Sequence, residues 1–313
     1  MAGAVPERFS HQALLYSTEQ QYLDGTVPFI QGALASEEPV LVAVSRAKID
    51  LLAGELDGHT DRVVFADMTE LGANPARIIP AWSDFLAEHS APGRGVRGIG
   101  EPVWPERGPA EMVECHRHES LLNLAFADAR GFQLLCPYDA GALDPEDLEE
   151  ARRNHPFIVE AGDRRESETC RSLDAVAAPF ADPLPEPASP AEELAFGIGM
   201  LARLRRLVHH IAANAGFDPV GRADLVLAVD EVASNSVTHG GGGGTLRVWL
   251  EEDTLVCEVR DRGIIDVPLA GRERPEPGQL GGYGLWLANL LCDLVQVRSF
   301  PDGSVVRLHK RRH

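Results

Sequence analysis

The sequence predicts an α/β protein of two domains, and three observations lead to that prediction. The chain of 313 residues is long enough for two hydrophobic cores. A stretch at 179–190 holds five prolines and almost no periodic apolar pattern, which predicts an extended linker between domains at 1–178 and 191–313. Short apolar runs alternate with helical spacing before this linker, whereas alternating strands follow a pair of helical segments after it.

The first domain is predicted to be doubly wound, with helices on both faces of a parallel sheet. Its short apolar runs are typical of strands buried on both faces, and they lie at 40–44, 63–66, 96–99 and 132–136. Segments with helical spacing separate them, at 23–34, 47–56, 75–89 and 111–129. Strand–helix alternation of this kind predicts right-handed crossovers.

The second domain is predicted to be an α/β sandwich. Residues 191–215 have the apolar spacing of one amphipathic helix. Asp218 and Pro219 supply an N-cap and a first-turn proline for the next helix. Alternating patterns predict strands, with Asp302-Gly303 as a hairpin turn, at 245–250, 255–260, 295–299 and 305–308.

Composition excludes several classes of function. The net charge of −19 argues against nucleic-acid binding, which needs a basic face. No apolar run reaches membrane-spanning length, and the amino terminus lacks a signal-peptide pattern. The five cysteines are scattered without paired spacing, which is typical of reduced thiols. We therefore expect a cytoplasmic protein.

The second domain carries polar residues and glycines in an order that suits nucleotide chemistry. Glu231 and Asn235 stand four residues apart on a predicted helix and so share one face. A carboxylate that orients a nucleophile, beside an amide oxygen that ligates a hard cation, suits such a site. The sequence Asp-Arg-Gly at 261–263 follows a predicted strand, and Gly-Gly-Tyr-Gly at 281–284 opens a predicted helix. The five glycines at 240–244 are typical of a flexible turn, with nucleotide contact as the alternative.

Over residues 192–310 this order of motifs resembles the GHKL ATPases, and among them the anti-sigma-factor serine kinases. The resemblance implies ATP and Mg²⁺ as cofactors, with Mg²⁺ on Asn235 and Glu231 as the general base. It implies that Asp261 accepts the adenine amino group and that Gly263 lets the backbone approach the base. Phosphates would meet the glycine loop and the N-terminal amides of the following helix, at Gly282, Tyr283, Gly284 and Leu285.

The loop between Asp261 and Gly281 occupies the place of the ATP lid in that family. Some anti-sigma kinases have an arginine immediately before the glycine motif, where this chain has Gln279-Leu280. Arg272 or Arg274 is a candidate substitute from within the lid. The departure weakens the case for fast phosphoryl transfer more than the case for nucleotide binding.

The first domain resembles the MEDS sensory domains over residues 8–160. The resemblance lies in His11-Gln-Ala-Leu-Leu-Tyr16, in residues 28–44 and in Leu134-Leu-Cys-Pro-Tyr-Asp139. It implies a RecA-like fold, yet the chain contains no P-loop sequence. Asp67, at the end of a predicted strand, is expected to cap a helix or a turn.

One helix of the first domain offers a possible soft-metal or redox site. Glu111, Cys115 and His118 fall at i, i+4 and i+7, and further candidate ligands are His11, His116 and Cys136. The alternative is a buried cysteine with surface or capping histidines, because no ligand pair of known spacing is present.

The leading hypothesis is an anti-sigma factor that uses ATP and Mg²⁺ to phosphorylate a serine or threonine of an antagonist protein. The resemblance implies a sigma factor and this antagonist as partners, and a homodimer stays open. One alternative is a catalytically silent, nucleotide-gated switch that binds the sigma factor. Another is a sensor histidine kinase with His209 or His210 as acceptor, although proline-rich sequence occupies the place of its dimerisation hairpin.

Overall fold

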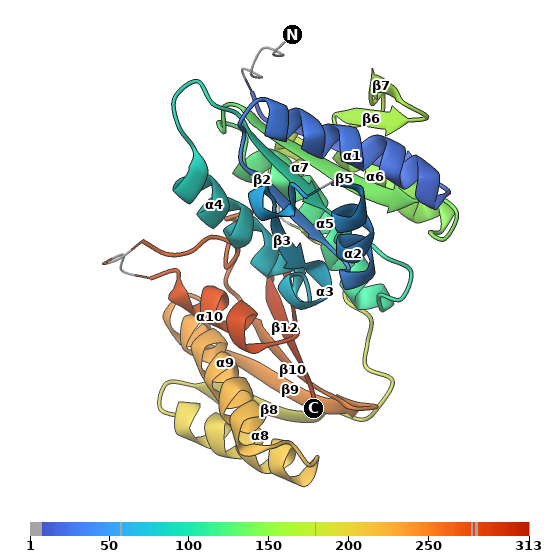
Figure 1. The fold of residues 1–313 in the computed structure, drawn as a ribbon. Coiled ribbons are helices and arrows are strands. Elements are labelled where there is room, and N and C mark those ends of the chain that lie inside the picture. The colour runs from blue at the N-terminus through green and yellow to red at the C-terminus, as the bar shows by residue number, and fades with distance from the viewer. Residues whose placement is uncertain (1–7, 57, 179, 277, 279–280, 313) are drawn as a thin grey trace. The chain divides into compact units, whose positions relative to one another are not determined.

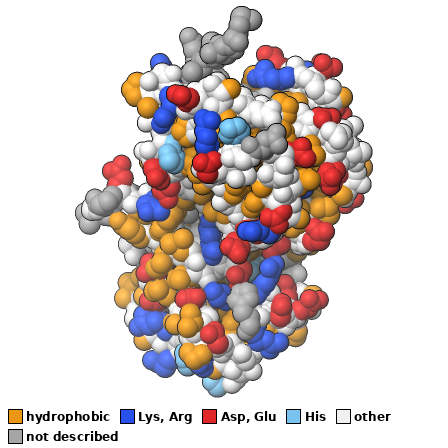
Figure 2. Space-filling model, in the orientation of Figure 1, with side chains coloured by type: hydrophobic (Ala, Val, Ile, Leu, Met, Phe, Trp, Pro, Cys, Tyr) orange, Lys and Arg blue, Asp and Glu red, His pale blue; other side chains and the backbone are white. Residues whose placement is uncertain are grey.

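The computed structural model describes residues 8–312 except 57, 179, 277, 279 and 280, and it divides into two compact units, Met1–Val176 and Ala177–His313 (Figure 1). Within the described residues, no helix is both long and apolar enough to cross a membrane. Acidic and basic side chains are intermixed over the surface seen in Figure 2. The net charge of −19 is therefore not gathered into one acidic patch on that face.

Unit 1 is built on a seven-stranded sheet with the order β3-β2-β4-β5-β1-β6-β7. Every neighbouring pair is parallel except the β6–β7 hairpin at one edge. The strands are β1 Ser10–Tyr16, β2 Val40–Val44, β3 Val64–Asp67, β4 Val96–Gly100, β5 Phe132–Asp139, β6 Phe157–Glu160 and β7 Asp163–Glu166.

Helices cover both faces of this sheet. Alternate residues of β1 take opposite faces, and Leu14 and Tyr16 pack with buried residues of α1 and α2. On the other face Trp82 of α4 packs over Gly98 and contacts the Phe132 ring. The helices of this part are α1 Glu19–Ala35, α2 Arg46–Glu55, α3 Met68–Leu71, α4 Ile78–His89, α5 Pro109–Ala125, α6 Pro145–Asn154 and α7 Leu173–Ala177, with 3₁₀ turns at Thr60–Arg62 and Pro75–Arg77. The doubly wound prediction is confirmed. Asp67 caps α3, since its carboxylate accepts the Thr69 N–H at 2.9 Å.

Unit 2 is a two-layer α/β sandwich, as predicted. Its antiparallel sheet has the order β11-β12-β10-β9-β8, and its helices lie against one face (Figure 1). Leu225, Val229 and Val232 of the central helix pack against Leu246 and Val259 of the sheet. The strands are β8 Glu192–Gly197, β9 Gly243–Glu251, β10 Thr254–Asp261, β11 Leu294–Phe300 and β12 Gly303–Arg311, and the helices are α8 Leu201–Asn214, α9 Pro219–Thr238 and α10 Tyr283–Leu291.

The prediction of one helix over 191–215 is wrong for its first part. Residues Glu192–Gly197 form β8, which pairs with β9 so that Leu194 lies opposite Leu246. Gly199 then adopts a left-handed φ of 84°, and α8 begins only at Leu201. This segment is a strand rather than a helix because alternate residues, Leu194 and Phe196, pack in the core. Gly197 and Gly199 also disfavour a continuous helix.

The proline-rich segment at 180–190 contains no helix or strand, and its backbone binds the sheet of unit 2. The carbonyl of Phe180 accepts the Ser299 N–H at 3.0 Å. The carbonyl of Asp182 accepts from the Arg298 guanidinium at 3.0 Å, and that of Pro185 from Arg307 at 2.8 Å. This segment is therefore held against the sheet rather than free to act as a spacer.

Candidate nucleotide-binding site

Helix α9 provides Glu231 and Asn235. It starts as predicted, because the Asp218 carboxylate accepts the Gly221 N–H at 2.8 Å and Pro219 occupies the first turn. Its core face consists of Leu225, Ala228, Val229, Val232, Ala233 and Ser236. Glu231 is half-buried and Asn235 exposed, so both lie away from the centre of the core face. The helix therefore presents a carboxylate and an amide one turn apart at the edge of the core.

Asp261, the last residue of β10, is fixed by three hydrogen bonds. Its Oδ1 accepts the Gly263 N–H at 2.7 Å and the Ser304 hydroxyl at 3.1 Å. Its Oδ2 accepts the Ser236 hydroxyl at 2.5 Å. These contacts tie β10 to α9 and β12, so the orientation of the carboxylate is set before any ligand arrives.

The sequence patterns did not single out Ser236 and Ser304 as parts of this site, and they offered Gly240 only within the run of five glycines. A Cβ on Gly240 would lie 2.5 Å from Cγ of Asp261 and 2.7 Å from the Ser236 carbonyl. The first glycine of the run at 240–244 is therefore required by the close approach of α9 to Asp261, not only by a turn. Ser236 could have been recognised from the sequence, because it falls on the core side of α9. A buried hydroxyl there needs a hydrogen-bond partner.

The start of α10 lies directly against Asn235. Gly282 is the N-cap residue with a left-handed φ of 86°, and Tyr283 opens the helix. A Cβ on Gly284 would lie only 2.6 Å from Nδ2 of Asn235, so the helix backbone and this amide are in close contact. The structure thus brings together Asn235 and the glycine motif, which lie about fifty residues apart in the chain.

Lid residues that precede the undescribed positions contact α10. A Cβ on Gly271 would lie 2.7 Å from Cβ of Leu285, and the Gly271 carbonyl accepts from Asn289 at 2.9 Å. The guanidinium of Arg274 lies 5.9 Å from the ring centre of Trp286. The Tyr283 hydroxyl donates to the carbonyl of Glu276 at 3.0 Å. Gln279 and Leu280, where the chain departs from the anti-sigma kinase pattern, lie outside the described residues.

The geometry fits a nucleotide with a hard cation. The amide of Asn235 lies against the start of α10, where the N–H groups of the first turn and the helix dipole favour anionic phosphate. The carboxylate of Asp261 can accept from an exocyclic amine, as adenine offers. Glu231, one turn before Asn235, provides the carboxylate that a proton transfer requires.

Two family models match the chain, one in each domain. Residues 10–156 match MEDS, the methanogen/methylotroph, DcmR sensory domain. Residues 197–310 match the histidine kinase-like ATPase domain. Serine-protein kinase RsbW of Listeria monocytogenes serotype 4a is 34% identical over 110 residues, which cover 31% of this chain and 70% of the relative. RsbW of Listeria innocua serovar 6a matches to the same extent.

The chain belongs to the RsbW serine-protein kinase family. Among solved structures, the RsbU and RsbW domains of Rv1364c from Mycobacterium tuberculosis are similar at 22% identity and a TM-score of 0.31. That likeness covers 40% of this chain and 33%, about a third, of the other. The Acinetobacter baumannii histidine kinase AdeS is similar at 10% identity and a TM-score of 0.22, over 40% of this chain and 70% of that one.

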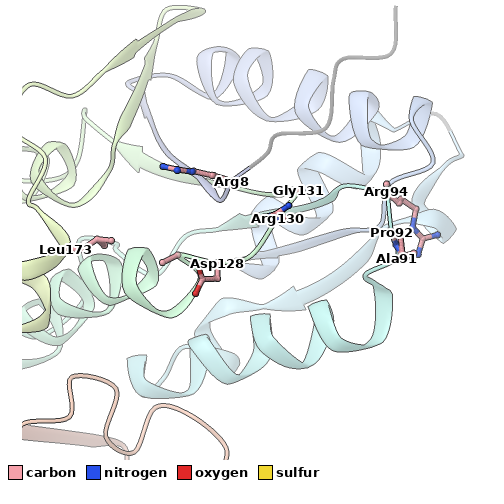
Figure 3. Close-up of a pocket in the computed structure, with 10 residues that line it drawn as sticks. Arg8, Ala91, Pro92, Arg94, Asp128, Arg130, Gly131 and Leu173 are labelled. Carbon is pink, nitrogen blue, oxygen red and sulfur yellow. The ribbon is translucent and has the colours of Figure 1, made fainter.

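The MEDS sensory domain of this RsbW-family chain, at residues 10–156, borders at least two cavities among the residues that the structure describes. The larger, of about 800 Å³, lies at the amino ends of β1, β4 and β5, where Arg8, Arg94 and Arg130 precede the three strands (Figure 3). Asp128 is the acidic residue in its lining. The excess of positive charge suits an anionic group.

The smaller cavity, of about 260 Å³, lies at the carboxyl ends of β2, β3 and β4, the usual place for ligands in open α/β sheets. Glu101 at its wall is buried and forms an ion pair with Lys48. The Tyr16 hydroxyl donates to Glu101 at 3.0 Å. Burial raises the pKa of Glu101, and the Lys48 charge offsets part of that rise. A polar, preorganised wall of this kind suits a small sensed molecule.

The proposed metal ligands on α5 do not form one cluster with each other. Glu111 caps the helix, since its carboxylate accepts the Gly108 N–H at 3.1 Å. The Cys115 thiol donates to the Pro102 carbonyl at 3.3 Å, and His116 pairs with Asp147 at 2.8 Å. The histidines His209 and His210, the alternative phosphate acceptors, are exposed on α8.

Proposed function

We propose that the chain is an anti-sigma factor that binds ATP and Mg²⁺ and phosphorylates a serine or threonine of an antagonist protein. The observation that supports it most is the contact between Asn235 on α9 and Gly284 at the start of α10, with the fixed Asp261 carboxylate at the neighbouring end of β10. Membership of the RsbW family supports the same chemistry.

Each group has one task in this proposal. Asp261 accepts a hydrogen bond from the adenine amino group, and the backbone at Gly263 leaves room for the base. The N–H groups at the start of α10, from Gly282 to Leu285, bind phosphate oxygens. Asn235 would hold Mg²⁺, which would supply neutralising charge to the phosphates. Glu231 accepts the proton of the attacking hydroxyl.

We further propose that the MEDS domain and the lid bias the choice between two partners, a sigma factor and the antagonist. Lid residues Gly271 and Arg274 rest on α10, the helix whose amino end would bind phosphate. Binding of nucleotide at that end would therefore change what the lid contacts and which surface the domain offers.

The test uses the purified full chain with Mg²⁺, radiolabelled ATP and its cognate antagonist protein. We expect acid-stable phosphate on the antagonist, and its loss in Glu231→Ala by at least about 100-fold, the usual size of a general-base effect. Asp230→Ala is the matched control, because this neighbouring carboxylate pairs with Arg205 on α8 at 2.9 Å. It should transfer phosphate at the wild-type rate.

The outcomes separate the alternatives. ATP-dependent binding of the sigma factor without phosphate transfer would support the catalytically silent switch and contradict the kinase. Acid-labile phosphate on His209 or His210 would indicate a histidine kinase instead. Equal rates for wild type and Glu231→Ala would remove the assignment of the general base.

A further inference from the structure

A cluster of metal-ligating side chains lies inside the MEDS domain, apart from both cavities and from the nucleotide site. Its members are His11 of β1, Glu119 of α5, Cys136 of β5 and His155, which follows α6. All four are fully buried, and their ligand atoms lie within 4.8 Å of one another. The strands β1 and β5 are parallel neighbours, so adjacent strands, one helix and one helix end converge on the same point.

The distances fit a single tetrahedral ion. The Glu119 carboxylate lies 3.2 Å from Nε2 of His11 and 3.0 Å from Nε2 of His155. The Cys136 sulfur lies 3.4 Å from Nε2 of His11. Metal–ligand bonds of about 2.0–2.3 Å, as zinc forms, place ligand atoms about 3.3–3.8 Å apart in a tetrahedron. These three separations lie within a few tenths of an ångström of that range, and every pair among the four ligand atoms lies within 4.8 Å.

Hydrogen bonds at the far side of both imidazoles aim Nε2 at this point. The Nδ1 of His155 lies 2.7 Å from the Ala151 carbonyl, which only accepts, so Nδ1 carries the proton. Asn123 donates its amide to the Asn154 carbonyl at 2.7 Å and so presents its oxygen to Nδ1 of His11 at 3.1 Å. With Nδ1 as the donor, each ring in its neutral form turns an Nε2 lone pair into the cluster, as the outer hydrogen bonds of metal sites do.

Two Nε2 lone pairs that face a buried carboxylate are repelled by it unless a metal ion or a proton lies between them. Neither oxygen of Glu119 has a hydrogen-bond partner among the residues that the structure describes, despite the short contacts to both histidines. An uncompensated carboxylate in such surroundings is costly, whereas a coordinated divalent ion satisfies it.

We propose that His11, Glu119, Cys136 and His155 bind one zinc-type divalent transition-metal ion. On binding, the Cys136 thiol releases its proton and its sulfur forms a bond to the metal. The two positive charges of the ion then balance the carboxylate and the thiolate. Two imidazoles, one thiolate and one carboxylate in a tetrahedron suit Zn²⁺ or Co²⁺. Because no ligand is exposed, the ion would hold β1, β5, α5 and the end of α6 together.

The experiment combines metal analysis of the full-length chain with cobalt substitution. Protein purified without chelators should contain about one equivalent of zinc or a similar metal per chain. After removal of that metal, added Co²⁺ should give the absorption of tetrahedral cobalt with a thiolate-to-cobalt charge-transfer band. Cys136→Ser should lose that band. Cys115→Ser is the control, since this buried thiol bonds to Pro102 outside the cluster, and it should keep the band.

The proposal fails if the wild-type chain contains no stoichiometric transition metal and takes up neither Zn²⁺ nor Co²⁺. It also fails if Co²⁺ binds without a thiolate band, or if Cys115→Ser and Cys136→Ser lose the band equally while both remain folded by circular dichroism. If Cys136→Ser does not fold, X-ray absorption of the zinc-loaded wild type decides the question. One sulfur and three nitrogen or oxygen ligands support the site, and any other set contradicts it.

Discussion

Gly284→Ala should change the stability of unit 2 and its affinity for Mg-ATP in different directions. The new Cβ would lie 2.6 Å from Nδ2 of Asn235, about 0.9 Å closer than an ordinary contact of about 3.5 Å. Asn235 is exposed, so its amide can rotate away without disturbing the core. Alanine in a helix is about 1 kcal/mol better than glycine. We therefore expect a free energy of unfolding that is unchanged or raised by up to about 1 kcal/mol.

The affinity of Gly284→Ala for Mg-ATP should fall. A displaced Asn235 amide loses a contact with a charged ligand, which is worth about 1.5–3 kcal/mol, or about 10- to 150-fold in Kd. Calorimetric titration with Mg-ATP and denaturant unfolding measure the two quantities on the same protein. Gly54→Ala is the control, because nothing lies within 4 Å of a Cβ there. Wild-type affinity in Gly284→Ala would refute the role of Asn235.

Three further expectations test the packing and electrostatics of the two units. Burial, then the charges of neighbouring arginines, lowers the pKa of His309 to about 4. Between pH 6.5 and 4, His309 is therefore protonated in the unfolded chain but neutral in the folded chain. Stability should therefore fall by about 3 kcal/mol as pH drops through that window, and His309→Asn should lose this part of the slope in denaturant titrations at several pH values. Lys48→Met leaves the buried Glu101 carboxylate without its ion-pair partner and should destabilise the MEDS domain by about 3 kcal/mol in the same assay. An unchanged free energy of unfolding would contradict the ion pair. Trp82→Ala should cost about 3–5 kcal/mol, because the 1%-exposed indole fills the space over Gly98, and a cost below about 1 kcal/mol would mean that the packing of this face is wrong.

Local patterns predicted most of the fold because they act within one element. The apolar run at 40–44 became β2 with the predicted bounds, and Asp218-Pro219 started α9 as the cap rules indicate. The pattern at 192–197 misled because Leu194 suits a helix stripe and a strand face equally well. Only pairing with β9 decides between them.

Contacts between distant segments were beyond such patterns. Ser304, forty-three residues after Asp261, donates its hydroxyl to that carboxylate. Its neighbours in the sequence are typical of a hairpin and do not distinguish it from other serines near a turn. Spacing on α5 favours Glu111, Cys115 and His118 as ligands, whereas Glu119 is the residue of that helix whose carboxylate lies 3.2 Å from Nε2 of His11. His11 and His155 are 144 residues apart, and no spacing rule joins them.

The most direct test of the nucleotide site compares Mg-ATP uptake by the full-length wild type and by Asp261→Asn. The variant can keep the Gly263 N–H bond through its amide oxygen, while the Ser236 hydroxyl turns to accept from the new NH₂ group. That NH₂ group would oppose the adenine amino group, donor against donor. We expect calorimetric heat of binding for the wild type and at least about ten-fold weaker binding for the variant, with unchanged affinity for Mg²⁺ alone. Absence of ATP uptake by the wild type, or equal uptake by both proteins, would contradict the account.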